Sequence, residues 1–221
     1  MADARAHVRQ LAAEFAQKGN PLGWFEALYA EAGSDSSVIP WADMKPNPGL
    51  VEFWQKNPLE TAGKRALVIG CGLGDDSEQL SMWGFQTTAF DISPTAIAAT
   101  TKRYPHSKVV YAVADLFAPS ASWTRAFDFV LEVFTVQAFQ GDLRAKAVVK
   151  IAEFVAPGGE LLVVTRGRAA DEPEGQGPPW PLTREEIDGF LRAGLAEQSF
   201  EDYADPEPPW VRRFRALYRR P

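Results

Sequence analysis

Apolar residues recur with a helical period in some segments and form short strand-like runs in others. Near the beginning, a helix is predicted over residues 3–18, with Val8 and Leu11 on its apolar face, and a second short helix carries Trp24 to Tyr29. From residue 65 onward, short apolar runs alternate with helical segments such as 143–155 and one opened by a capping box at 183–186. Strands are predicted at 66–69, 86–92, 108–114, 127–133 and 160–165, followed by a hairpin-like pair at 195–203 and 210–219. This alternation predicts an α/β fold with a largely parallel sheet.

Three glycines at alternate positions follow the first predicted strand. Gly70, Gly72 and Gly74 allow a tight turn and a close approach of the backbone to a ligand, before a helix begins near Asp75. The spacing differs from the Gly-x-Gly-x-x-Gly pattern of dinucleotide-binding folds, and Asp75 and Asp76 add negative charge. A zwitterionic amino-acid tail therefore fits this turn better than a diphosphate. A glycine-rich structural turn is the alternative interpretation.

Acidic residues end the next predicted strands. Asp91 lies about 20 residues beyond Gly70, where a doubly wound fold places the carboxylate that binds ribose hydroxyls. Asp115 follows the third strand and can accept a hydrogen bond from an adenine amino group, or it can cap a helix. Glu132 lies near the end of the fourth strand, in a segment expected to face the ligand because pockets form at that edge of a parallel sheet.

Two loops carry unusual residues. Segment 38–49 is rich in proline but includes Trp41, so it is predicted to be a rigid loop that packs on the core or covers a ligand. Segment 169–181 is long and rich in turn residues, which is typical of functional or disordered loops, and it includes Trp180.

Arginines near the end of the chain have two predicted roles. Arg166 and Arg168 follow the fifth strand, where they either bind a substrate carboxylate or remain solvated. The last predicted strand pair carries a cluster that is interpreted as an exposed, charged strand face and not as a nucleic-acid site: Arg212, Arg213, Arg215, Arg219 and Arg220.

Composition narrows the class of protein. The 221 residues suffice for one domain with a substantial core, and 46% of them are hydrophobic. The net charge of −6 argues against nucleic acid as the main partner. No apolar run approaches the length of a membrane span, and the first residues lack the apolar core of a signal peptide. The single cysteine, Cys71, is consistent with a reducing cytoplasm and is interpreted as a small buried residue.

Taken together, these motifs resemble the class I S-adenosylmethionine-dependent methyltransferases over about residues 65–218. The resemblance rests on the glycine turn, on Asp91, on Asp115-Leu116-Phe117 and on Pro157-Gly158-Gly159 before the fifth strand. It implies a doubly wound, Rossmann-like sheet of seven strands with an antiparallel last strand and helices on both faces. Residues 1–60 would then form a helical cap and a Pro/Trp loop within a single domain of residues 1–221.

The resemblance also implies a set of residues around S-adenosylmethionine. The glycines would lie along its methionine part, Asp91 would bind the ribose and Asp115 the adenine. The residues predicted to bind the cofactor are Trp41, Gly70, Cys71, Gly72, Gly74, Asp91, Ile92, Asp115, Leu116, Phe117 and Glu132. No metal site is predicted.

Within that class the chain looks most like the thiopurine S-methyltransferase group, which includes thiol and halide methyltransferases. Pro40-Trp41 with Asp43 and the stretch Gly177-Pro178-Pro179-Trp180 carry this likeness. The group usually has the acid directly after the Trp, whereas Ala42 intervenes here, and it often has an aromatic where Asp75 stands. Residues predicted to contact the substrate are Tyr29, Asp43, Arg166, Arg168 and Trp180.

The scarcity of histidine bears on the acceptor. Only His7 and His106 are present, and a thiol needs little help because its pKa of about 8.5 leaves a few per cent thiolate at neutral pH. A phenol or alcohol usually needs a base, for which Asp43, Glu132 or Tyr29 could substitute, and no catalytic base is assigned. The sequence thus favours methylation of a small thiol or other soft nucleophile by a monomer or homodimer. The alternatives are O- or N-methylation of a small metabolite, a non-catalytic cofactor-binding protein, and a nicotinamide dehydrogenase, which the glycine spacing disfavours.

Overall fold

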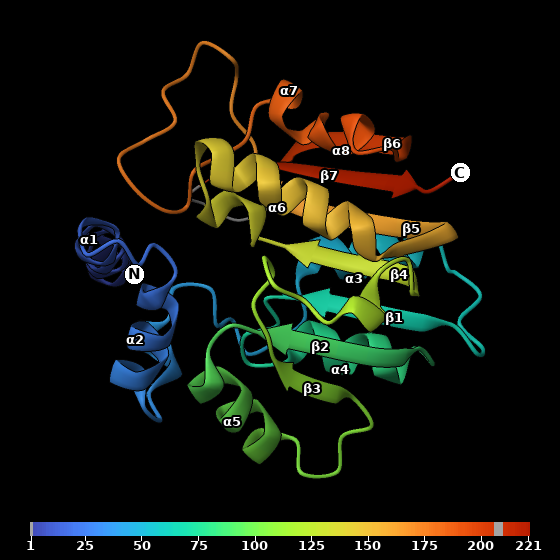
Figure 1. Ribbon diagram of the computed structural model, residues 1–221, viewed down its shortest axis with the longest axis horizontal. Helices are drawn as coiled ribbons and strands as arrows, with labels where there is room; N and C mark the ends of the chain where they lie inside the picture. Colours follow the sequence, from blue (N-terminus) through green and yellow to red (C-terminus); the bar gives the residue numbers. More distant parts are fainter. Residues whose placement is uncertain (1, 206–209) are drawn as a thin grey trace.

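A seven-stranded sheet forms the centre of the computed structural model, which describes residues 2–205 and 210–221 (Figure 1). Its spatial order is β3-β2-β1-β4-β5-β7-β6. The strands are β1 (Arg65–Ile69), β2 (Gln86–Asp91), β3 (Val110–Val113), β4 (Phe127–Val133), β5 (Val155–Arg166), β6 (Ala196–Ala204) and β7 (Arg212–Arg219). Strands β1 to β5 pair in parallel, and β7 runs antiparallel between β5 and β6. The predicted seven-stranded sheet with an antiparallel last strand is confirmed.

Helices cover both faces because alternate strand residues point to opposite sides of the sheet. On one face, Leu67 and Ile69 of β1 pack with residues of α6 (Gly141–Phe154) and with Phe190 of α8 (Gly189–Arg192). On the other face, Ala66 and Val68 pack with α3 (Pro48–Lys56) and α4 (Asp75–Met82). Helix α5 (Pro94–Arg103) packs on β2 and β3, and α7 (Arg184–Ile187) precedes α8. Short 3-10 turns lie at Ser36–Val38, Ala121–Trp123 and Val136–Ala138.

Two helices, α1 (Ala2–Gln17) and α2 (Gly23–Ala32), lie beyond the carboxyl ends of the parallel strands (Figure 1). Val8 of α1 and Trp24 and Leu28 of α2 share a small apolar cluster. Glu26 of α2 accepts hydrogen bonds from the Ser93 hydroxyl (2.5 Å) and the Thr95 hydroxyl (2.6 Å) at the beginning of α5. The N-terminal helices therefore form a cap over the edge of the sheet where the glycine turn lies.

The sequence-based boundaries were wrong at three places. The proline-rich segment 38–49 was expected to be a loop throughout, but α3 begins at Pro48 with Asn47 as its N-cap, and proline suits the first helical position. Strand β5 begins at Val155, directly after α6, so Pro157-Gly158-Gly159 lies within the strand. The helix opened by the capping box at Thr183 is divided into α7 and α8.

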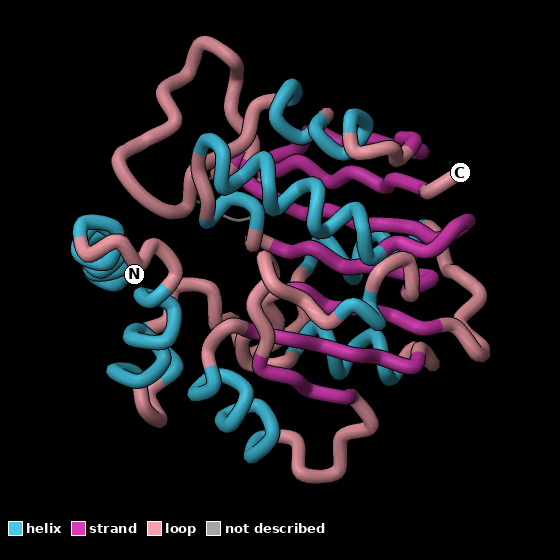
Figure 2. Tube along the Cα trace, in the orientation of Figure 1, coloured by secondary structure: helices cyan, strands magenta, loops and turns pink. Residues whose placement is uncertain are grey.

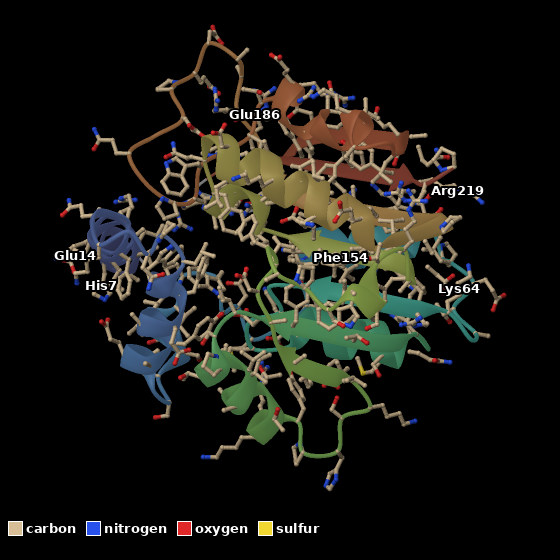
Figure 3. The ribbon with its side chains drawn as sticks, viewed as in Figure 1. His7, Glu14, Lys64, Phe154, Glu186 and Arg219 are labelled. Atoms are coloured by element: carbon tan, nitrogen blue, oxygen red, sulfur yellow. The ribbon has the colours of Figure 1, made fainter. Side chains whose placement is uncertain are left out.

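The loop over 169–181, seen as the long excursion at the top of Figure 2, is held to the body of the protein by a buried arginine. Arg144 of α6 is 4% exposed and donates to Glu174 (2.5 Å), to Glu186 and to the Trp180 carbonyl (3.2 Å). Figure 3 labels Glu186, the residue of α7 to which Arg144 donates. None of the described helices is long and apolar enough to cross a membrane.

Candidate active site

A cavity of ≈ 290 Å³ lies at the carboxyl ends of the strands, between the sheet and the α1–α2 cap. Segments far apart in the chain form its wall: the cap, the Pro/Trp loop, and the turns after β1, β2, β3, β4 and β5. Twelve of the residues singled out from the sequence lie on this wall, namely Tyr29, Trp41, Asp43, Gly70, Cys71, Gly72, Asp91, Ile92, Asp115, Leu116, Phe117 and Arg166.

The turn after β1 requires glycine for two physical reasons. Gly70 and Gly72 have φ angles of +58° and +52°, in the left-handed region that disfavours residues with a Cβ atom. A Cβ atom on Gly70 would also lie 2.6 Å from the Thr135 hydroxyl oxygen, and one on Gly72 would lie 2.9 Å from the Tyr29 hydroxyl oxygen. At Gly70 and Gly72 the cavity wall is therefore formed by backbone atoms alone.

Replacing Gly72 with alanine is expected to reduce cofactor affinity at least roughly tenfold, because the left-handed backbone and the clash with Tyr29 displace the turn. Isothermal titration with S-adenosylhomocysteine measures this change. Gly63→Ala is the matched control, since Gly63 also has a positive φ of +75° but a Cβ atom there would meet nothing within 4 Å. Equal loss in the two variants would contradict the expectation.

Asp91 is buried, and its carboxylate holds the glycine turn in place through hydrogen bonds. Its Oδ2 accepts from the backbone N–H of Gly72 (2.9 Å), and its Oδ1 accepts from that of Ser93 (2.9 Å). Burial raises the pKa of Asp91, while these backbone donors oppose the rise. One carboxylate thus joins the turn after β1 to the turn after β2 and still lies on the cavity wall.

Asp115 and three aromatic residues form another part of the wall. The Asp115 carboxylate accepts from the backbone N–H of Phe117 (2.8 Å), so it stabilises its own turn. The Phe117 ring packs edge-on against Phe139 (centroids 5.5 Å apart), which packs edge-on against Phe25 (6.5 Å). A carboxylate beside aromatic rings suits a planar base that carries an amino group.

Two adjacent acids at the beginning of α4 differ in their surroundings. Asp75 forms a two-pronged ion pair with Arg103 (2.7 and 2.8 Å). Asp76 accepts from the backbone N–H of Asn47 (2.7 Å), and burial raises its pKa to about 6. Since Asp76 lies on the cavity wall with its charge only partly compensated, it is placed to pair with a ligand ammonium group.

The family follows from comparison with known proteins. The family model described as "Thiopurine S-methyltransferase (TPMT)" matches residues 34–216, which is most of the chain. The chain belongs to the thiopurine S-methyltransferase family. It is accordingly an enzyme that transfers methyl groups from S-adenosylmethionine.

Individual relatives agree with this assignment. The chain is 28% identical over 166 residues to "Probable thiol methyltransferase 2" of Arabidopsis thaliana, covering 73% of this chain and 70% of that protein. It is 24% identical over 178 residues to the thiopurine S-methyltransferase of Vibrio atlanticus, covering 75% and 81%. The fold is similar to that of the Burkholderia thailandensis 1,6-didemethyltoxoflavin-N1-methyltransferase, with a TM-score of 0.68, 18% identity and coverage of 95% and 90%.

The cavity wall of this methyltransferase offers groups that suit the methionine, ribose and adenine parts of S-adenosylmethionine. The glycine turn can accommodate the methionine backbone, Asp76 can meet its ammonium, and Asp91 can accept from ribose hydroxyls. The aromatic wall beside Asp115 suits the adenine ring. These assignments to individual residues are proposals, of which the Gly72 variant above and the Asp91 variant below test two.

Four predicted site residues do not line the cavity of the methyltransferase. Gly74 is the N-cap of α4, where a Cβ atom would meet Thr100 and Tyr111. Glu132 is fully buried and off the cavity wall, and its Oε1 accepts from the backbone N–H groups of Thr135 (2.6 Å) and Val136 (2.9 Å), so it holds the turn after β4.

The other two residues outside the wall belong to the region of the long loop. Arg168 is occupied by the carbonyls of Pro181 (3.1 Å) and Glu172 (2.9 Å) and by Glu186 (3.3 Å). The backbone N–H of Trp180 donates to the Gln137 carbonyl (2.7 Å), while Pro178 and Pro179 line the cavity in its place. The local pattern did not separate Arg166 from Arg168, although only the former faces the cavity.

Some wall residues were not predicted, among them Arg5 of α1 and Arg213 of β7. The segment from Glu132 to Gln137 was expected to face the ligand, and Phe134 and Gln137 of that segment do lie on the wall. Phe134 has a φ of +65°, an unusual conformation for a bulky residue. The interpretation of the last arginines as an exposed face was wrong for Arg213, which lies on the cavity wall, and for Arg215, which is 2% exposed and pairs with Glu201 (2.5 Å).

Proposed function

We propose that this methyltransferase acts on the sulfur of a small thiol or a similar soft nucleophile. The observation that supports this is the lack of an imidazole at the cavity: His7 and His106 are both exposed, and neither lies on the wall. His7, labelled at α1 in Figure 3, bonds to Glu31 of α2 (2.6 Å). The names of the two relatives, one a thiol and one a thiopurine methyltransferase, agree with this proposal.

The groups on the wall contribute mainly by orientation. When bound, S-adenosylmethionine would supply a sulfonium methyl group to the acceptor thiolate, whose proton has been released to water; the new S–CH₃ bond would replace the sulfonium S–CH₃ bond, and the electron pair of the broken bond would stay on the sulfur of S-adenosylhomocysteine. Burial raises the pKa values of Tyr29 and Cys71 well above their ordinary values, so both side chains stay neutral at pH 7. Tyr29 accepts from the Trp41 indole (2.9 Å), which fixes both rings beside the glycine turn. Orientation in a dry site can supply up to about 7–11 kcal/mol.

A second candidate is O- or N-methylation in which Asp76 acts as general base and does not pair with the cofactor ammonium. Its pKa of about 6 is close to the value that suits a base at neutral pH. On that mechanism, activity would fall as pH drops through about 6 and would be lost in an Asp76→Asn variant even when the cofactor is saturating.

Release of S-adenosylhomocysteine from matched acceptors distinguishes the two. We expect turnover of thiophenol and far slower turnover of phenol, because a thiol with a pKa of about 8.5 or lower ionises without a base. Cofactor binding, measured by titration, serves as the control for folding. Turnover of phenol at a rate similar to that of thiophenol, or of neither, would contradict the proposal for a thiol acceptor.

We further propose that the enzyme works as a single domain of residues 1–221, in the cytoplasm, as a monomer or homodimer, and not on nucleic acid. The net charge of −6 and the small cavity support a small-molecule acceptor. Light scattering after size exclusion measures the oligomeric state, cell fractionation measures the location, and a single cooperative unfolding transition is expected of one domain.

A further inference from the structure

Two arginines face each other across neighbouring strands at one end of the cavity. Arg166, the last residue of β5, is the direct register partner of Arg213 in antiparallel β7, and both side chains lie on the cavity wall. Like charges directly opposite one another destabilise a sheet. The presence of this unfavourable pair at the rim of a ligand cavity therefore indicates a role in binding a negatively charged ligand group.

The positive charge there is only partly compensated. Arg213 pairs with Asp205 (2.9 Å) and lies over the Phe134 ring, 4.6 Å from its centroid. Within residues 2–205 and 210–221, the Arg166 guanidinium forms no ion pair. Burial, together with the charges of Arg5 and Arg213, lowers the pKa of Arg166 to about 10, so it remains cationic at neutral pH.

This cluster is separate from the part of the cavity assigned to the cofactor. The glycine turn follows β1, whereas Arg166 and Arg213 lie on β5 and β7, on the other side of β4. With a strand spacing of about 4.8 Å, the arginines stand roughly 10–14 Å across the sheet from that turn. The Gln137 side chain accepts from the backbone N–H of Arg166 (2.8 Å) and so fixes the end of β5.

We propose that the methyl acceptor carries, apart from its reacting atom, an anionic group such as a carboxylate or sulfonate, and that Arg166 and Arg213 bind this group. Guanidinium groups match such oxyanions with paired hydrogen bonds. Arg5, on the same wall, would add a third donor from the cap. The proposal rests on the proposed function only in that the occupant of this end of the cavity is the acceptor.

The test compares 4-mercaptobenzoate with 4-mercaptobenzamide, which differ in charge but little in shape. For the wild type we expect the carboxylate to have the higher kcat/KM, and in Arg166→Gln we expect the ratio of the two kcat/KM values to fall roughly 10- to 100-fold. Arg212→Gln is the matched control, because Arg212 is the adjacent residue of β7, pairs with Asp202 (2.6 Å) and lies outside the cavity. Its ratio is expected to stay at the wild-type value.

Two further measurements distinguish failure of the anion-site proposal from failure of the thiol proposal. If Arg166→Gln weakens binding of S-adenosylhomocysteine and leaves the acceptor ratio unchanged, the arginine serves the cofactor and the proposal is overturned. If neither thiol reacts, the thiol proposal fails, and binding of 4-(methylthio)benzoate and its amide to protein saturated with S-adenosylhomocysteine decides the anion site. Preference for the carboxylate that Arg166→Gln abolishes supports the site, and equal affinities overturn it.

Discussion

Replacing Asp91 with asparagine is expected to weaken binding of S-adenosylmethionine by about 1–3 kcal/mol, which is roughly a 5- to 150-fold rise in Kd. Each carboxylate oxygen of Asp91 accepts from a different backbone N–H group, that of Gly72 or that of Ser93. A carboxamide has a single oxygen, so its NH₂ group would face one of these donors. The glycine turn would shift, and the predicted contact with the ribose would be lost with it.

Calorimetric titration of the variant with S-adenosylmethionine provides the measurement. Asp128→Asn is the matched control, since the Asp128 carboxylate also accepts from a backbone N–H group, that of Arg65 (2.8 Å), but at the beginning of β1, at the opposite edge of the sheet. The control is expected to lose some stability and no cofactor affinity. An unchanged Kd for Asp91→Asn would show that this carboxylate has no part in binding the cofactor.

Replacing Glu132 with glutamine is expected to stabilise the protein at pH 8 by up to about 3 kcal/mol and to change its stability little at pH 4. Burial raises the pKa of Glu132 from 4.5 to about 7, so the folded state binds its proton more tightly than the unfolded chain does. Stability from this group is therefore greatest below pH 4.5 and is lost as pH rises to about 7. Glutamine keeps an oxygen for the N–H groups of Thr135 and Val136 and never ionises.

Urea unfolding of wild type and variant at pH 4, 6 and 8 measures this difference. Among the described residues, the Glu132 Oε2 atom is buried and has no hydrogen-bond partner, which is why its ionised form is costly. The pKa of Asp76 is also raised, but Asp76 is present in both proteins, so its contribution to the pH dependence of stability cancels in the comparison. Glu60→Gln, at an exposed loop position, is expected to follow the wild-type curve. Parallel curves for Glu132→Gln and wild type would refute the expectation.

Local patterns predicted well which residues of the turns after β1, β2 and β3 line the cavity. A strand that ends in a glycine turn or in an acid is visible over a few residues, and parallel pairing then brings Gly70, Asp91 and Asp115 to one edge. Helix α3 was missed because Pro46 and Pro48 suggested a loop, although Asn47 before Pro48 is an acceptable helix beginning.

The side of the cavity where we propose that the acceptor binds was harder to predict, because it depends on contacts between distant segments. The place of Arg213 on the wall follows from its register with Arg166, and the sequence of β7 alone does not reveal that register. The burial of Arg215 likewise depends on Glu201 of β6 and Glu52 of α3. Arg5 reaches the cavity only because α1 folds back over the sheet, which no local pattern indicates.

The position of β7 has a consequence for biosynthesis. It is the last strand along the chain, yet it lies inside the sheet and pairs with β5 on one side and β6 on the other. While a ribosome is still making residues 212–219, β5 has an open edge and β6 has no neighbour, and open strand edges promote aggregation. The sheet therefore closes only after translation has passed β7, and the same late step brings Arg213 to the cavity.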